Sequence, residues 1–122
     1  SPSSWTREGL LTSTLVNGGL FNNATRPTTL FQLGCWGGYF VDPRYNSLSH
    51  SLLLQPSGAA AVIAATGLTE VSSDELFSQV ALPSLRQGRR IGDVVRDSAN
   101  AIRLSPAGAN ALDVIIGTAV LG

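Results

Sequence analysis

The order of apolar and polar positions along the chain predicts alternating strands and helices. Thr28–Gly34 is rich in β-branched and aromatic residues and predicts a strand. Ala59–Thr66 is almost wholly apolar, which is typical of a strand covered on both faces. A third strand-like run is Asp113–Leu121. Together with the helices between them, these runs favour a mostly parallel sheet with helices on both faces.

Three segments have the apolar spacing and the end signals of helices, at residues 47–55, 72–87 and 91–104. Asn46 or Ser47 is suited to cap the first, and Ser72 or Ser73 the second. Pro83 predicts a kink or a break in the second helix near residue 82. The pattern of residues 8–16 fits either a short helix or an extended segment.

The composition narrows the range of partners. Charged residues make up only 13% of the 122 residues, against about 25% in ordinary soluble domains, so buried elements or a piece of a larger domain are expected. The net charge is zero, and Arg86, Arg89 and Arg90 are typical of a solvated helix end, so no nucleic-acid partner is expected. No apolar run reaches the roughly 18 residues of a membrane span, so no membrane partner is expected either.

The stretch Gly34–Phe40 carries the candidate chemistry because it holds the single cysteine, Cys35. A residue just after a buried strand lies where open α/β sheets bind their ligands. A lone cysteine is often a small buried hydrophobe, and no base is adjacent in the sequence, so core residue and nucleophile both stay open. Trp36 and Tyr39 are suited to wall a cleft or to fill the core.

Short motifs spread over most of the chain are similar to those of the gingipain family of cysteine peptidases. They include Leu33-Gly34-Cys35-Trp36 with Tyr39-Phe40, Ala65-Thr66-Gly67-Leu68-Thr69, and Ile91-Gly92-Asp93-Val94. The resemblance implies a caspase-like three-layer α/β/α sandwich with a mostly parallel sheet, of which this chain is a part. It also implies that residues 1–122 form the carboxy-terminal portion of the peptidase domain, with the catalytic histidine segment before Ser1.

The same resemblance implies that Cys35 is the nucleophile of a cysteine-type endopeptidase and that its backbone N–H helps to hold the oxyanion. It gives no catalytic role to His50, the only histidine. The residues that it suggests for substrate binding are Trp36, Tyr39, Thr66, Gly67, Glu70 and Asp74. For the two acids, which would select a basic side chain, favourable placement at a helix start is the competing interpretation.

The expected partners are a polypeptide substrate and the amino-terminal segment of the same peptidase domain, without which the chain is expected to be inactive. No metal or other cofactor is expected. The sequence does not give the compartment, although the resemblance slightly favours a secreted or cell-surface bacterial protein. Two competing hypotheses are a non-enzymatic caspase-like interaction module and a fragment that self-associates by exchanging strands.

Overall fold

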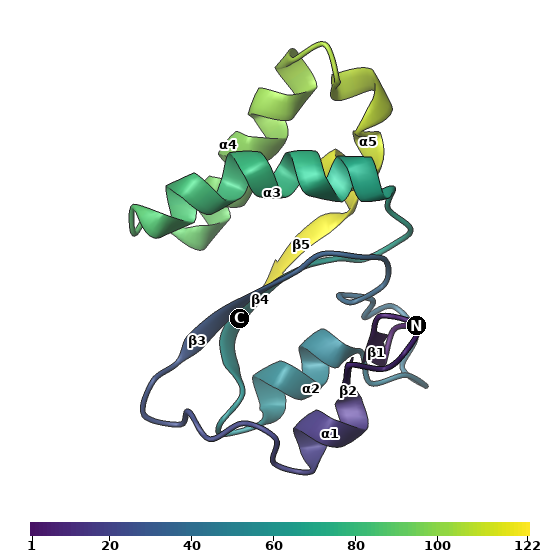
Figure 1. Cartoon of the computed structure of the whole chain (residues 1–122), viewed down its shortest axis with the longest axis vertical. Helices are drawn as coiled ribbons and strands as arrows, with labels where there is room; N and C mark the ends of the chain where they lie inside the picture. Colours follow the sequence, from purple (N-terminus) through teal and green to yellow (C-terminus); the bar gives the residue numbers. More distant parts are fainter.

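The computed structural model describes all residues, 1–122, and places a three-stranded sheet at the centre of the chain (Figure 1). The strands lie in the order β3 (Thr28–Gln32), β4 (Ala59–Ala65) and β5 (Thr118–Leu121). β3 and β4 are parallel, and β4 and β5 are antiparallel. The parallel pair is therefore confirmed, and the antiparallel partner is added by the last strand of the chain.

Helices cover both faces of this sheet, as Figure 1 shows. On one face lie α3 (Val71–Arg86), α4 (Ile91–Leu104) and α5 (Leu112–Gly117), with a 3₁₀ turn at Gly108–Asn110 before α5. On the other face lie α1 (Ser13–Asn17) and α2 (Leu48–Leu54). This is the predicted α/β/α arrangement of three layers.

The strand β4 is buried because it contributes side chains to both faces. Val62 and Ala64 pack with Leu48 and Leu52 of α2 in one apolar cluster. On the opposite face a second cluster centres on Phe77 of α3, whose ring stacks on the ring of Phe31 at a centroid distance of 5.9 Å. The nearly continuous apolar sequence of β4 thus reflects burial on both sides.

The first residues form a small antiparallel ribbon of β1 (Ser4–Trp5) and β2 (Leu11–Thr12), followed directly by α1. Residues 8–16 therefore contain both of the structures that their pattern allowed. The indole Nε1 of Trp5 donates to the Leu33 carbonyl at 2.7 Å. This bond ties the ribbon to the chain just before Cys35.

The predicted start of α3 was wrong, because the cap position is Glu70 and no side chain caps the helix. Ser72 and Ser73 lie inside its first turn. The predicted break at Pro83 is also absent, and the helix continues to Arg86. Buried Phe77 and Ala81 anchor the helix to the core before the proline, so tertiary packing overrides the local preference.

The predicted strand 113–121 is also corrected, since its first part belongs to α5 and only Thr118–Leu121 is a strand. A short apolar run has no period that separates a strand from a buried helix. The turn from α5 into β5 is fixed by Thr66, whose backbone N–H and hydroxyl both donate to the Gly117 carbonyl, at 2.8 and 2.9 Å.

Candidate active site

Cys35 lies three residues beyond the end of β3, at the carboxyl edge that β3 shares with its parallel neighbour β4. Its side chain is half-buried and forms no disulfide. The sequence prediction that the cysteine follows a strand at this edge is confirmed. This is the edge at which α/β sheets bind ligands.

The loop that carries Cys35 contains a strained residue. Trp36 has a φ of 68°, which bulky side chains rarely adopt. Its backbone N–H donates to the Gly67 carbonyl at 2.9 Å, and its ring meets the Tyr39 ring edge-on at 5.0 Å. Strain of this kind persists where the surroundings hold it, often at functional sites.

Gln32, the last residue of β3, packs against the loop that carries Cys35. Its side chain is only 8% exposed, and a Cβ on Gly37 would overlap the Gln32 side-chain amide. The Gly37 carbonyl accepts the Ser49 hydroxyl at 2.7 Å. Gly37 is therefore needed for close approach of the loop to the sheet and to α2.

The Cys35 sulfur is surrounded by polar groups of a single residue, Thr69, in the loop after β4. The thiol donates to the Thr69 carbonyl at 3.3 Å, and the Thr69 backbone N–H donates to the sulfur at 3.4 Å. The Thr69 hydroxyl oxygen lies 3.8 Å from the sulfur and donates to Oδ2 of Asp74 at 2.9 Å. The sulfur thus has one acceptor and one backbone donor in reach.

Asp74 lies in the first turn of α3 and is half-buried. Burial raises the pKa of its carboxyl above the ordinary value, and the nearby Asp113 acts in the same direction. Hydrogen bonds from the Thr69 hydroxyl and the Gly34 backbone amide oppose this rise in pKa without cancelling it. Asp74 therefore contacts both loops that surround the sulfur.

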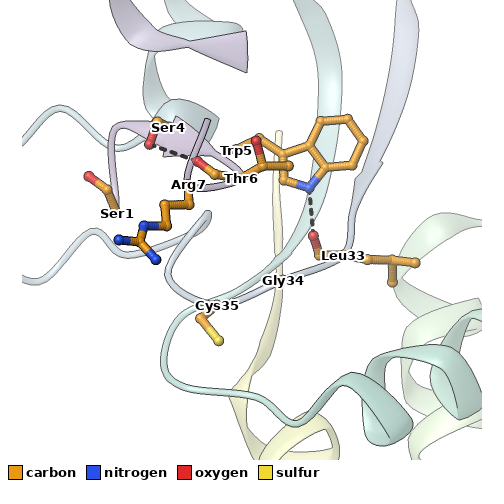
Figure 2. Close-up of a pocket in the computed structure, with 8 residues that line it drawn as sticks. All are labelled: Ser1, Ser4, Trp5, Thr6, Arg7, Leu33, Gly34 and Cys35. Carbon is orange, nitrogen blue, oxygen red and sulfur yellow. Dashed lines mark hydrogen bonds between the residues drawn. The ribbon is translucent and has the colours of Figure 1, made fainter. Parts of the chain in front are cut away.

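An open cleft of about 440 Å³ lies between the first residues of the chain and the segment that ends at Cys35 (Figure 2). Its walls come from the β1 ribbon and from residues 33–35 at the end of β3. Figure 2 shows the Cys35 thiol, the Arg7 side chain and the Trp5–Leu33 hydrogen bond around it. The lining residues are Ser1, Ser4, Trp5, Thr6, Arg7, Leu33, Gly34 and Cys35.

A second cleft, of about 360 Å³, lies beyond Thr69. Two acids line it, Glu70 and Asp113, and Oδ2 of Asp113 accepts the Glu70 backbone N–H at 2.6 Å. Leu68 and Leu112 give it apolar walls. Thr69 lines this cleft and also contacts the sulfur, so the cleft adjoins the candidate nucleophile.

The predicted site residues divide into groups by their position. Trp36, Tyr39 and Gly67 belong to the Cys35 loop or contact it, and Glu70 faces the second cleft. The Thr66 hydroxyl is engaged by the Gly117 carbonyl. His50 is exposed on α2 and lines a separate cleft with Phe40 and Tyr45.

Two residues at the site were missed as functional candidates. Thr69 acts mainly through its backbone and lies 34 positions from Cys35, so no sequence motif joins them. The sequence feature that could have identified Thr69 is its position just after β4, the parallel neighbour of β3. Gln32 was visible as a lone amide in an apolar strand next to the cysteine.

Neither a metal site nor a membrane-spanning helix is found among residues 1–122. Nowhere do three or more His, Cys, Asp or Glu side chains gather closely enough to hold a metal ion. No helix combines the length and the apolar character that crossing a membrane requires.

The chain belongs to peptidase family C25, whose sequence pattern it matches over residues 1–122. This confirms the family resemblance seen in the sequence. A comparison with curated protein sequences finds no match.

Among solved structures, the chain is similar to the Arg-specific cysteine proteinase gingipain R. The TM-score is 0.71 at 18% sequence identity, and the similarity covers 100% of this chain and 30% of the gingipain R chain. At this identity the similarity shows the fold. The chain therefore shares the caspase-like fold and spans about a third of the length of the gingipain R chain.

Proposed function

We propose that this chain supplies the nucleophile of a cysteine endopeptidase and that Cys35 is that nucleophile. The single observation that carries the proposal is the position of Cys35, which lines a cleft at the carboxyl edge of the parallel strands. Membership of a cysteine peptidase family supports it. The substrate is a polypeptide.

In the proposed reaction the Cys35 thiolate attacks the peptide carbonyl carbon and forms a tetrahedral oxyanion. The C–N bond then breaks, the amine leaves with a proton from the base, and the acyl group stays on sulfur as a thioester. Water hydrolyses the thioester and restores the thiol. The Cys35 backbone N–H donates to no acceptor within the chain, unlike the N–H groups of Trp36 and Gly38, and is available for the oxyanion.

The base is a histidine from outside residues 1–122, carried by the amino-terminal segment of the same domain. Two observations support this part of the proposal. The chain spans 30% of the gingipain R chain, and β3 lies at the edge of the sheet, so its second edge is available to a further strand. A parallel strand added there would end beside Cys35. Residues 1–122 are then the carboxy-terminal portion of the domain.

The second cleft is the proposed site for the substrate side chain next to the scissile bond. Glu70 and Asp113 give it two carboxylates, which favour a basic side chain. Trp36 and Tyr39, whose rings meet edge-on in the loop after Cys35, stay predicted substrate-binding residues from the family resemblance, and neither of the two clefts includes them. A secreted or cell-surface location stays a prediction from the family resemblance.

The direct test replaces Cys35 with Ala in the full-length protein and follows the hydrolysis of a denatured protein substrate. We expect the variant to lose all measurable hydrolysis while its thermal unfolding stays close to that of the wild type. Arg103→Ala, at an exposed position at the end of α4, is the control and keeps its activity. Activity in Cys35→Ala equal to that of the control would refute the assignment.

A non-enzymatic interaction module is the second candidate, because the only histidine of the chain lines a different cleft from Cys35. The two candidates differ in the reactivity of the thiol. A nucleophile paired with a base is alkylated faster than a free cysteine at neutral pH, because more of it is thiolate. A module would show ordinary reactivity or protection.

A further inference from the structure

We propose that Asp74 is a positioning residue for Cys35: its carboxylate holds the Thr69 hydroxyl, and Thr69 holds the sulfur. The inference rests on the proposed function, since it assigns a role toward the thiol in that reaction. It departs from the sequence interpretation of Asp74 as a selector of basic substrate side chains. These hydrogen bonds, from Asp74 through Thr69 to the Cys35 sulfur, form a relay. The relay joins the loop after β3, the loop after β4 and the first turn of α3.

The hydrogen-bond partners of the Cys35 sulfur all belong to Thr69. A sulfur that donates to the Thr69 carbonyl and accepts from the Thr69 N–H is confined to one side-chain orientation. The Thr69 carbonyl holds the thiol proton in the resting state. Once the base removes that proton, the Thr69 N–H at 3.4 Å still faces the sulfur and stabilises the thiolate.

Thr69 in turn is fixed by Asp74. The Thr69 hydroxyl has a single proton and donates it to Oδ2 of Asp74 at 2.9 Å. The hydroxyl oxygen stays 3.8 Å from the sulfur, so it serves to orient Thr69. Asp74 is itself held by α3, where its backbone N–H donates to the Glu70 carbonyl at 3.0 Å. The rigid start of a helix thereby determines where the sulfur lies.

The surroundings of Asp74 argue for positioning over substrate binding. Neither the cleft beside Cys35 nor the cleft of Glu70 includes Asp74 among its lining residues. Its carboxylate instead receives the Thr69 hydroxyl at 2.9 Å, and the nearby Gly34 backbone amide lowers the pKa of the same carboxyl. A carboxylate engaged in this way holds two loops together.

The test measures kcat and KM of the full-length peptidase on a peptide substrate for Asp74→Ala, which removes the acceptor of the Thr69 hydroxyl, for Thr69→Val and for the double variant. We expect each single variant to lower kcat by about 10- to 100-fold with little change in KM, because a displaced nucleophile reacts slowly. The double variant should be no slower than the slower single variant, since both changes break the same relay. Thr69→Ser keeps the hydroxyl and should retain kcat close to that of the wild type.

Electrostatics cannot produce the expected fall in kcat. Removing a negative charge near a thiol does not disfavour a thiolate, so the loss of the Asp74 charge alone does not account for a slower reaction. Asp93→Ala is the matched control, because Asp93 is the first-turn acid of α4, the other long helix. It removes a helix-start charge from a place without contact to Cys35 and should leave kcat unchanged.

The proposal is overturned if Asp74→Ala raises KM and leaves kcat intact, which is the result expected for an acid that binds substrate. It is also overturned if the losses in the double variant multiply. The alkylation rate of Cys35 by iodoacetamide in the same variants needs no peptidase activity. A wild type that cleaves nothing would refute the proposed function, whereas alkylation that is indifferent to Thr69→Val would refute the relay.

Discussion

At the scale of single residues, the loop that carries Cys35 is shaped by uncharged contacts. The side chain of Gln32 fills the space beneath Gly37, and Ser49 of α2 binds the Gly37 carbonyl. Trp36 is held at a positive φ by its bond to Gly67. The conformation of the loop that carries Cys35 is therefore determined by contacts with the end of β3 and with the loop after β4.

Replacing Gly37 with Ala should lower the free energy of unfolding by about 1–3 kcal/mol, because the added methyl overlaps the Gln32 amide and the well-packed site has to shift. Chemical denaturation of the full-length protein measures the effect. Gly92→Ala is the control, since Gly92 lies in α4 with open space around it, and it should stabilise by about 0.4–1 kcal/mol. Equal effects of the two substitutions would contradict the close packing at Gly37.

Asp74 makes the stability of the fold depend on pH in a predictable direction. Because burial raises the folded-state pKa of Asp74, the folded state binds its proton more tightly than the unfolded state does. The contribution of this group to stability therefore falls as pH rises from the ordinary value of 3.8 through the raised pKa. At neutral pH the charge is a cost that the Thr69 and Gly34 hydrogen bonds reduce.

Asp74→Asn should consequently be at least as stable as the wild type at pH 7, and it should lack this part of the pH dependence. Denaturation curves between pH 3 and pH 7 provide the measurement. Combined with the fall in kcat expected for Asp74→Ala, this result would mark a residue kept for function at a cost in stability. A variant that is less stable than the wild type at pH 7 would show that Asp74 has a structural role instead.

At the scale of the elements, the sequence predicted β3, β4, α2 and α4 to within about two residues. Their apolar periods are long and their ends carry clear signals, such as Ser47 before α2. Alternation of these elements also placed Cys35 at the carboxyl edge of the sheet. α5 and β5 were read as a single strand because a short apolar run fits either structure.

The details of the site could not be predicted because they depend on distant pairs. The contact between Cys35 and Thr69 requires β3 and β4 to be parallel neighbours with the observed register. The start of α3 was misplaced because Ser72 and Ser73 have capping side chains that the chain does not use. Sequence patterns report which residue types suit a position, and tertiary contacts decide which of them is used.

The two serine positions provide a test of this difference. Ser47 accepts the His50 backbone N–H at 3.2 Å and caps α2, so Ser47→Ala should cost about 1 kcal/mol of unfolding free energy. Ser72→Ala lies within α3 and should be neutral or slightly stabilising, because alanine has the higher helix propensity. Thermal unfolding of both variants is the measurement. A larger loss for Ser72→Ala would contradict the observed start of α3.

At the scale of the whole molecule, residues 1–122 contain a three-stranded sheet in which β3 is an edge strand. The chain contains the proposed nucleophile and the cleft beside it, and its single histidine lies elsewhere. We therefore expect the isolated chain to cleave no peptide, and to gain activity when the amino-terminal segment of the domain is present. If the isolated chain cleaves peptides, the proposal that the catalytic histidine lies outside residues 1–122 is refuted.

The central claim, that Cys35 is an activated nucleophile, is tested most directly by labelling the full-length protein with a peptidyl acyloxymethyl ketone. Such a reagent is attacked by a catalytic thiolate and stays attached to the sulfur, and mass spectrometry of the digested protein locates the adduct. We predict one adduct, on Cys35, whose formation is slowed by competing substrate. A protein that is left unlabelled at Cys35 while it cleaves peptides would contradict this claim.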